Sequence, residues 1–329
     1  MDNLENDYEE KDTNVSRFVN CVNRDADVIK NIYKGESKQN KLALLHLNIR
    51  SLKNKENFES IINFLTVLQV EFDIIAVTET WFMSLEEANF FSIDNYVAEH
   101  FIRGSRGGGV TLFIHNSCEY VRKNIDIVNA ESVFVEIRRS DVRGKILVGG
   151  IYKPPNMNND NIQEFTNSIH LLLNQYVSKK CILLGDLNID LTKQEGMDFS
   201  NELSSMGLIS CIDIPTRVTP LSSSVIDHIF TNIMDQFIES GTIDVDISDH
   251  KATFVIFENL MIKFKHINDG DYFNFKNYNY DDFEKNLKKT DWNKISRMTD
   301  PNAAYSEFCQ IFYNLSKCFI CAKKKIKEN

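Results

Sequence analysis

Short apolar runs separated by polar segments dominate the middle of the sequence. They are rich in valine and isoleucine and only six to eight residues long, which is typical of buried β-strands. We therefore expect strands at residues 42–47, 72–77, 109–114, 132–137, 145–152, 181–186 and 252–257.

Two of the segments between these runs have the spacing of amphipathic helices. Apolar residues recur every three or four positions in residues 56–70 and again in residues 161–176. Hairpins are expected around residues 95–150, where the predicted strands follow one another closely. Strands mixed with helices and hairpins in this way predict an α/β sandwich.

Composition divides the chain into three parts. Residues 1–40 are polar and charged, and we interpret them as a flexible acidic leader with a short helix around residues 15–33. The apolar runs place the core domain at residues 41–258. Residues 259–329 are expected to form a linker and a helical connector, with amphipathic helices over 281–289 and 301–327.

The net charge of −10 bears on the partners that the protein can bind. Nucleic-acid-binding proteins usually carry a basic surface, so this acidity argues against tight, sequence-independent DNA binding. The charge is uneven, however, because six acidic residues against one lysine give −5 within the first 12 residues. A metal-dependent phosphodiesterase also concentrates carboxylates around its cation. The composition therefore does not exclude catalysis on DNA.

The sequence shows little sign of a membrane-spanning helix, a secretory signal or a disulfide framework. No apolar run approaches the roughly 20 residues that a membrane-spanning helix needs, and the acidic start does not resemble a secretory signal. Seven cysteines at irregular spacing favour a reduced, intracellular protein over a disulfide framework.

Polar residues follow several predicted strands at the points where the apolar runs end. Ionisable groups at strand ends in α/β folds gather at one edge of the sheet, where ligands bind. Each residue taken alone is more simply a turn former or a helix cap. The set as a whole indicates a shared cleft, and it comprises Asn48, Glu79, Tyr152, Asp186, Asn188, Asp227, Asp249 and His250.

In this order the set resembles the endonuclease/exonuclease/phosphatase superfamily, which includes deoxyribonucleases, abasic-site endonucleases, inositol polyphosphate phosphatases and retrotransposon endonucleases. The resemblance extends over residues 42–257. It implies a DNase-like four-layer α/β sandwich, in which a two-sheet β-sandwich is flanked by helices and the site lies at one end. It also implies a divalent cation, Mg²⁺ or Mn²⁺, as cofactor.

The local sequence motifs are most similar to those of the endonuclease domain of non-LTR, or LINE-type, retrotransposons. That similarity implies a nuclear enzyme whose nick in DNA leaves a 3′-hydroxyl for reverse transcription, although about 70 residues after the core are too few for a reverse transcriptase. Arg50 stands where the base-excision repair branch has an aspartate, so an abasic-site role is not expected. The similar segments are 46–55, 78–82, 106–115, 150–156, 185–191, 215–219, 225–232 and 247–253.

The resemblance also implies a set of metal ligands, which are Glu79, Asn48 and Asp249. Hard cations such as Mg²⁺ prefer carboxylate oxygen, so Glu79 is the first choice. Asn48 and Asp249 are expected to complete or support the shell of oxygen ligands around the ion.

The candidate catalytic residues are Asp227, His250, Asp186, Asn188 and Tyr152. A carboxylate beside an imidazole orients the ring and stabilises its protonated form, so Asp227 is expected to hold His250 against the phosphate. Asp186 is the candidate general base on water or general acid to the leaving oxygen, and both assignments stay open. Asn188 and Tyr152 are expected to bind phosphate oxygens.

Two other functions compete with this one. The chain could be a phosphatase or phosphodiesterase of the same superfamily on a non-DNA substrate such as an inositol phosphate, which its acidity mildly favours. It could also be an inactive remnant that acts as a binding module. Arg103 and Arg106 are either phosphate contacts or solvated surface arginines, and His46 is assigned no catalytic role.

Overall fold

The computed structural model describes residues 19–34, 41–140, 142, 144–155, 159–176, 179–233, 238–258 and 280–298, with short helical pieces between 304 and 315. The chain divides into two compact units, Met1–Ile262 and Lys263–Asn329. The first unit carries the sheets and every predicted site residue.

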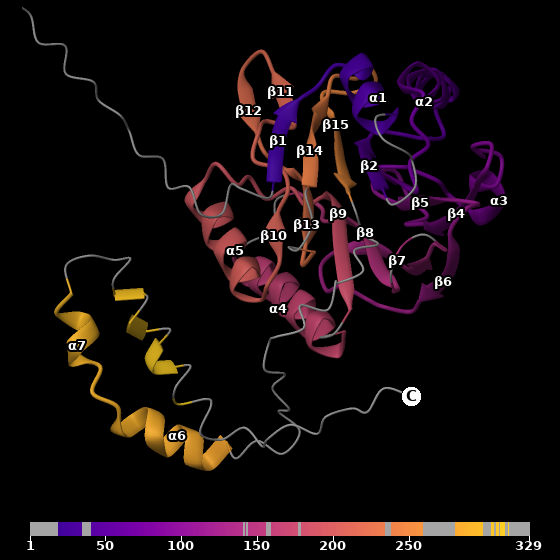
Figure 1. Ribbon diagram of the computed structural model, residues 1–329. Helices are drawn as coiled ribbons and strands as arrows, with labels where there is room; N and C mark the ends of the chain where they lie inside the picture. The colour runs from indigo at the N-terminus through magenta and orange to yellow at the C-terminus, as the bar shows by residue number, and fades with distance from the viewer. Residues whose placement is uncertain are drawn as a thin grey trace, which may run out of the picture. The chain divides into compact units, whose positions relative to one another are not determined.

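A seven-stranded sheet and a six-stranded sheet form the centre of the first unit (Figure 1). The seven-stranded sheet has the spatial order β1 (Val19–Asn23), β14 (Ile238–Ile243), β15 (Ala252–Phe257), β2 (Leu42–Asn48), β3 (Ile74–Thr78), β5 (Val110–His115) and β4 (Tyr96–Phe101). The six-stranded sheet has the order β10 (Ile209–Ser210), β13 (Asp227–Thr231), β9 (Lys180–Asp186), β8 (Ile146–Tyr152), β7 (Glu131–Arg138) and β6 (Glu119–Lys123). A separate hairpin consists of β11 (Arg217–Thr219) and β12 (Ser222–Ser224).

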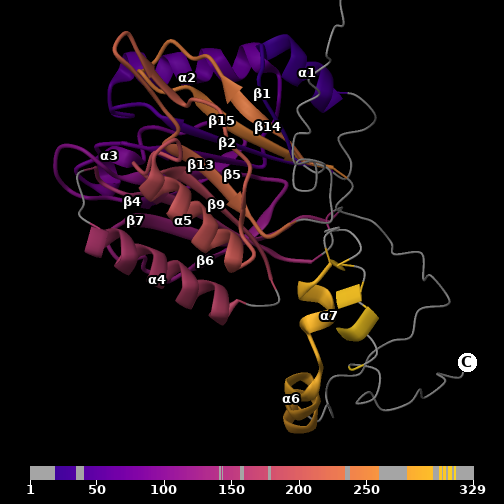
Figure 2. The ribbon, with the colours of Figure 1, turned by 90° about the vertical axis from the view of Figure 1, so that its left-hand side faces the viewer.

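Helices cover the two outer faces of this sandwich (Figure 2). α1 (Ala26–Lys34) and α2 (Lys55–Leu68) lie on the seven-stranded sheet, and α4 (Asn159–Gln175) and α5 (Gln194–Ser205) lie on the six-stranded sheet. The short helix α3 (Leu85–Ala88) follows β3. The four layers confirm the predicted α/β sandwich, and the seven apolar runs are confirmed as β2, β3, β5, β7, β8, β9 and β15.

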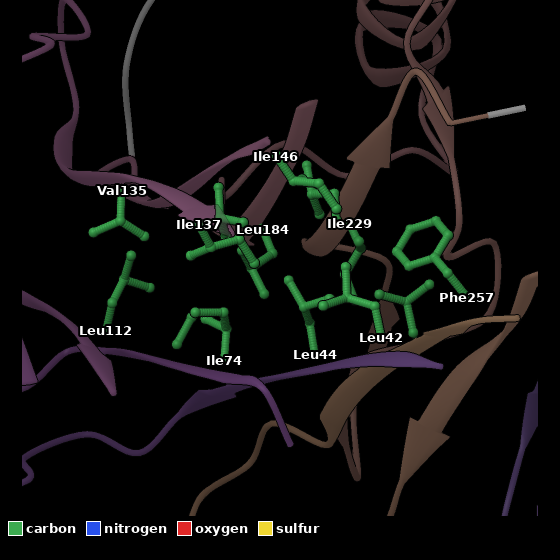
Figure 3. Packing of buried hydrophobic residues seen from close by; sticks show 14 of the residues in the cluster. Leu42, Leu44, Ile74, Leu112, Val135, Ile137, Ile146, Leu184, Ile229 and Phe257 are labelled. Atoms are coloured by element: carbon green, nitrogen blue, oxygen red, sulfur yellow. The ribbon is translucent and has the colours of Figure 1, made fainter. Parts of the chain in front are cut away.

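Strict alternation along the strands builds three apolar layers. On β2, Leu42 and Leu44 point into the core between the sheets, whereas Ala43 and Leu45 point toward α1 and α2. Figure 3 shows side chains of both sheets meeting in the central layer. The seven runs read as continuously apolar because both faces of these strands are covered.

The expectation of a flexible leader is wrong for residues 19–34. Val19–Asn23 pairs in parallel with Ile238–Ile243 as the edge strand β1, and Ile29 and Tyr33 of α1 are buried in the layer beneath the helices. The predicted helix around residues 15–33 therefore starts only at Ala26. Local periodicity could not reveal β1, because its partner lies about 220 positions away in the sequence.

The second unit is helical in the part that the structure describes. α6 (Tyr280–Lys289) confirms the helix predicted at 281–289, and α7 (Asn293–Ser296) follows it. Most of the helix predicted at 301–327 lies outside the described residues. None of the described helices combines the length and the hydropathy that crossing a membrane requires.

Candidate active site

The layer between the two sheets is apolar along most of its length and polar at one end. On β2, Leu42 and Leu44 face the opposite sheet, and His46 and Asn48 follow them in the same alternation. On β9 the same alternation places Asp186 at the end of the strand. The polar residues that end these strands are thus carried into the space between the sheets, where they are buried.

Four neighbouring strands each contribute a polar side chain at this end. The register pairs Glu131 on β7 with Tyr152 on β8. It also pairs Tyr152 with Asp186 on β9, and Asp186 with Asp227 on β13. Side chains of paired residues lie on the same face of a sheet. The register therefore brings Asp186 and Asp227 next to each other.

Two donors hold the Asp186 carboxylate. The Asn48 side chain donates from Nδ2 to Oδ2 at 2.7 Å, and the backbone N–H of Asn188 donates to Oδ1 at 3.0 Å. Burial, reinforced by the charge of Asp227, raises the pKa of Asp186 to about 7. A carboxyl group that titrates near neutral pH can both take up and release a proton, as acid–base catalysis requires.

Gly185 fixes the backbone directly before this carboxylate. A Cβ atom at this position would lie only 1.8 Å from the carbonyl oxygen of Ile151 on β8. No side chain fits between the two strands here, so glycine is required for their close approach. The close approach sets Asp186 beside Tyr152 at the ends of the two strands.

Asp227 and His250 form a buried ion pair. Nδ1 of His250 lies 2.8 Å from Oδ2 of Asp227. Burial alone would lower the pKa of His250, but the charge and hydrogen bond of Asp227 outweigh it and raise this pKa above its ordinary value. Burial would likewise raise the pKa of Asp227, but His250 lowers it. Both shifts favour a carboxylate on Asp227 beside a protonated ring on His250.

His46, for which the sequence predicts no catalytic role, lies next to Asp227 of this pair. Its Nδ1 is 3.8 Å from Oδ1 of Asp227, and its Nε2 is 2.9 Å from the hydroxyl of Thr78. Burial lowers the pKa of His46 to about 4, so the ring is neutral. The available signal was position, because His46 stands two residues before Asn48 and so faces the same side of β2.

The Glu79 carboxylate follows β3 on a left-handed backbone with φ of 60°. Its Oε1 accepts a hydrogen bond from the Tyr152 hydroxyl. Its Oε2 accepts hydrogen bonds from the indole N–H of Trp81 and the backbone N–H of Gly108. Burial and the neighbouring Glu79 raise the pKa of Tyr152, so the phenol remains the donor. A carboxylate has about four acceptor positions, so three donors orient Glu79 and leave one position for a cation.

Two predicted residues have other partners. Asn188 donates from Nδ2 to the carbonyl oxygen of Lys153 at 2.9 Å. Asp249, expected in the metal shell, contacts Arg217 at 2.8 Å and Arg50 at 3.2 Å. These arginines offset the charge of the carboxylate, and the place of Asp249 around the ion stays a prediction.

Glu131 and Arg103 extend the site beyond the predicted set. Glu131 accepts hydrogen bonds from Nε of Arg103 and, at 2.6 Å, from the backbone N–H of Gly109. The Arg103 guanidinium lies 5.6 Å from the centre of the Tyr152 ring. The contacts of Glu131 and Arg103 are therefore linked to Glu79 through Tyr152. Their partners come from separate strands and loops, so no local pattern could predict them.

The residues present suit a divalent cation. Glu79, Asp186 and Asp227 bring three carboxyl groups to this end of the sandwich, where His250 supplies one positive charge. Oδ1 of Asp227 is buried with no hydrogen-bond partner among the described residues. Carboxyl oxygens of Asp186 and Asp227 lie within 4.8 Å of each other and of a ring nitrogen of His250, whose role here is that of a counter-charge. Oxygen donors with excess negative charge fit Mg²⁺ or Mn²⁺.

Comparison with known families decides which superfamily this arrangement represents. The model of the Endonuclease/Exonuclease/phosphatase family matches residues 31–250, about two thirds of the chain. The chain belongs to the endonuclease/exonuclease/phosphatase family. Members of the endonuclease/exonuclease/phosphatase family are hydrolases of phosphodiesters or phosphate esters and typically depend on a divalent metal ion. The resemblance inferred from the ordered polar residues is thereby confirmed.

Solved structures of this family share the fold at low sequence identity. The endonuclease domain of TRAS1, a telomere-specific non-LTR retrotransposon, is 17% identical with a TM-score of 0.52, over 67% of this chain and 99% of that domain. A mannosyl-6-phosphatase of Bacteroides thetaiotaomicron is 16% identical with a TM-score of 0.52, over 65% and 98%. The human Nocturnin catalytic domain is 15% identical with a TM-score of 0.51, over 67% and 93%. A search of curated proteins gave no match.

Proposed function

We propose that this protein is a Mg²⁺-dependent DNA endonuclease, able to use Mn²⁺, which nicks a phosphodiester bond and leaves a 3′-hydroxyl. The observation that carries the proposal is the buried Asp227–His250 pair directly beside Asp186, with Tyr152 on the next strand holding Glu79. Phosphodiester cleavage needs acid–base groups and a bound cation close together. DNA as substrate and the nucleus as location follow from the LINE-type motifs.

Glu79 and Asn48 are the proposed ligands of the ion. Each retains an acceptor position on an oxygen at the polar end of the sandwich. Asp249 would join them only by leaving Arg50 or Arg217. Bound Mg²⁺ supplies positive charge to the phosphate oxygens as negative charge develops on them.

Proton transfer is assigned to Asp186, and stabilisation of charge on the phosphate to His250. Asp186 takes a proton from water or gives one to the leaving oxygen, and its raised pKa suits either role. With Nδ1 bound to Asp227, His250 would donate a hydrogen bond from Nε2–H to a phosphate oxygen and place its positive charge where negative charge develops. Asn188 retains a second amide N–H for the phosphate, whereas the proposed role of Tyr152 is to orient Glu79.

Nicking of supercoiled plasmid tests the proposal. We expect the 329-residue protein to convert plasmid to the open circle with Mg²⁺ or Mn²⁺ and not with EDTA. Glu79→Ala, Asp186→Asn and His250→Ala should each lower the rate at least 100-fold. Asp198→Ala, which removes an exposed carboxylate on α5, is the matched control and should nick at the normal rate. The nick should be extended directly by a DNA polymerase, which requires a 3′-hydroxyl.

Two outcomes would contradict this function. Normal nicking by the Asp186→Asn protein, with circular dichroism showing an intact fold, would remove Asp186 from the chemistry. Release of phosphate from inositol phosphates or sugar phosphates without plasmid nicking would favour a phosphatase of the same family. Failure to bind Mg²⁺ in calorimetry would instead indicate a non-enzymatic binding module.

A further inference from the structure

Arg106 is an exposed arginine that sits on an aromatic ring beside the candidate ion site. Its guanidinium lies 5.6 Å from the centre of the Trp81 ring. The Trp81 indole N–H in turn donates to Oε2 of Glu79. One side chain therefore separates the charge of Arg106 from the carboxylate proposed to hold the ion.

The backbone ties the same loop to Glu79 a second time. Gly108, two residues after Arg106, donates its N–H to Oε2 of Glu79 at 3.3 Å. The N–H of Trp81 donates to the carbonyl oxygen of Gly108 at 3.0 Å. The position of Arg106 is thus coupled to that of Glu79 through both the ring and the loop.

The two arginines of this loop differ in their partners. Arg103 is paired with the buried carboxylate of Glu131. Among the described residues Arg106 contacts no carboxylate, and its side chain is exposed. In a chain with a net charge of −10, an unpaired guanidinium at the edge of an acidic site is suited to an anion supplied by the substrate.

We infer that Arg106, braced on Trp81, binds a backbone phosphate next to the scissile one and so selects polynucleotides over small phosphate esters. This inference rests on the proposed nuclease function. A guanidinium presents paired N–H donors that match phosphate oxygens, and the ring beneath it limits its freedom. A phosphomonoester or a sugar phosphate has no neighbouring phosphate and gains nothing from this contact.

Comparing a polynucleotide with a small phosphodiester tests the inference. The substrates are a fluorescein-labelled DNA duplex and bis(p-nitrophenyl) phosphate, which has no flanking phosphate. Arg106→Ala should weaken duplex binding about tenfold and lower the slope of log affinity against log salt by about one. Its nicking rate should fall about tenfold more than its hydrolysis of the small diester. Arg106→Lys, which keeps the charge, should recover the salt slope.

Arg138→Ala is the matched control. Arg138 is exposed at the end of β7 opposite Glu131, roughly 23 Å along the strand from the site. Arg138→Ala removes the same charge as Arg106→Ala, and it should change neither duplex binding and nicking nor hydrolysis of the small diester.

A second pair of variants separates bracing from the orientation of Glu79. Binding is measured in EDTA, where ion binding by Glu79 plays no part. Trp81→Phe keeps a ring beneath the guanidinium and should bind duplex nearly as well as the natural protein, whereas Trp81→Leu should resemble Arg106→Ala.

Two results would overturn the inference while the nuclease function stands. One is a normal salt slope and affinity in the Arg106→Ala protein. The other is an equal loss on both substrates, which would mean that Arg106 acts only through Glu79. Absence of nicking and of diester hydrolysis in the natural protein would refute the proposed function itself.

Discussion

At the residue scale, the orientation of Glu79 depends on donors from three separate parts of the chain. Tyr152 comes from the opposite sheet, Trp81 from the loop after β3 and Gly108 from the loop before β5. Groups that hold a metal ligand in place tune its affinity as strongly as the ligand's own identity. The Tyr152 hydroxyl is the one donor of the three that can be removed without changing the shape of the core.

We therefore expect Tyr152→Phe to lower the affinity for Mn²⁺ about tenfold and to lower nicking by at least as much. The ring should still fill its place in the intersheet core, so the free energy of unfolding should change by less than about 1.5 kcal/mol. Calorimetric titration with Mn²⁺ and urea unfolding measure the two effects. Tyr120→Phe, which removes a hydroxyl bonded to Glu99, is the matched control. An unchanged Mn²⁺ affinity would contradict the orienting role.

The sequence predicted the polar residues of this site better than it predicted their partners. All eight candidates stand at strand ends or in the loops after them, where a change from apolar to polar residues is visible locally. The pairing of Asp249 with arginines, and of Arg103 with Glu131, joins segments about 30 to 200 residues apart. Such contacts follow from the register of the sheets, which one sequence does not reveal.

At the element scale, the end of the six-stranded sheet away from the site is held by charge. Glu136 on β7 is buried and contacts three lysines. Nζ of Lys123, at the end of β6, lies 3.5 Å from Oε1 of Glu136, and Nζ of Lys145, before β8, lies 2.9 Å from the same oxygen. Nζ of Lys179, before β9, contacts Oε2. The hydrogen bonds from Lys179 and Lys145 are the main causes that lower the pKa of Glu136 to about 2. One carboxylate thus connects four strands.

This pKa predicts how stability depends on pH. The unfolded glutamate has a pKa of about 4.3, so the contribution of Glu136 is complete above that value. It is lost as the pH falls from about 4 toward 2. We expect Glu136→Gln to lower the free energy of unfolding by about 1 kcal/mol at pH 7, because the lysines are partly exposed. Urea unfolding should show this difference shrinking below pH 4.

The matched control for this prediction is Glu119→Gln. Glu119 is an exposed carboxylate on β6 with no ion pair among the described residues. Glu119→Gln should leave the free energy of unfolding unchanged both at pH 7 and below pH 4. A Glu136→Gln difference that stayed constant down to pH 2 would mean that shape, not charge, sets its effect.

Elements were predictable where both faces of a strand are apolar. Four strands that the sequence does not reveal lack that signature, since β14 reads Ile-Glu-Ser-Gly-Thr-Ile and β10 to β12 are two or three residues long. β13 was visible only as an apolar stretch around Asp227. Short and polar strands are specified by the neighbours that they pair with, and propensity alone does not identify them.

At the scale of the whole molecule, residues 19–34 belong to the first unit, Met1–Ile262. Ile29 and Tyr33 are buried, and the Tyr33 hydroxyl donates to the carbonyl oxygen of Glu71 at 2.7 Å. β1 also covers the edge of β14. A protein without these residues would expose an apolar layer and a free sheet edge.

A chain beginning at Lys41 should therefore lose about 3 kcal/mol or more of unfolding free energy, since each buried apolar side chain contributes about 1.5–3 kcal/mol. A chain ending at Ile262, which keeps the first unit whole, is the control and should unfold as the first unit of the full protein does. Urea titrations followed by circular dichroism compare them. Equal midpoints for the chain beginning at Lys41 and the control would show that β1 and α1 are dispensable.

The pairing of β2 with β15 has a consequence for how the protein is made. β2 leaves the ribosome well before β15, its neighbour on one side, which is roughly 200 residues further along the chain. At ordinary elongation rates of about 5–20 residues per second, that interval is roughly 10–40 s. Throughout this interval the edge of β2 that pairs with β15 has no partner, although every residue of β2 is buried in the folded protein, and an unpaired edge invites association with other nascent chains. Slow codons between residues 48 and 252 should lower the yield of native protein, and chaperone binding to the nascent chain should restore it.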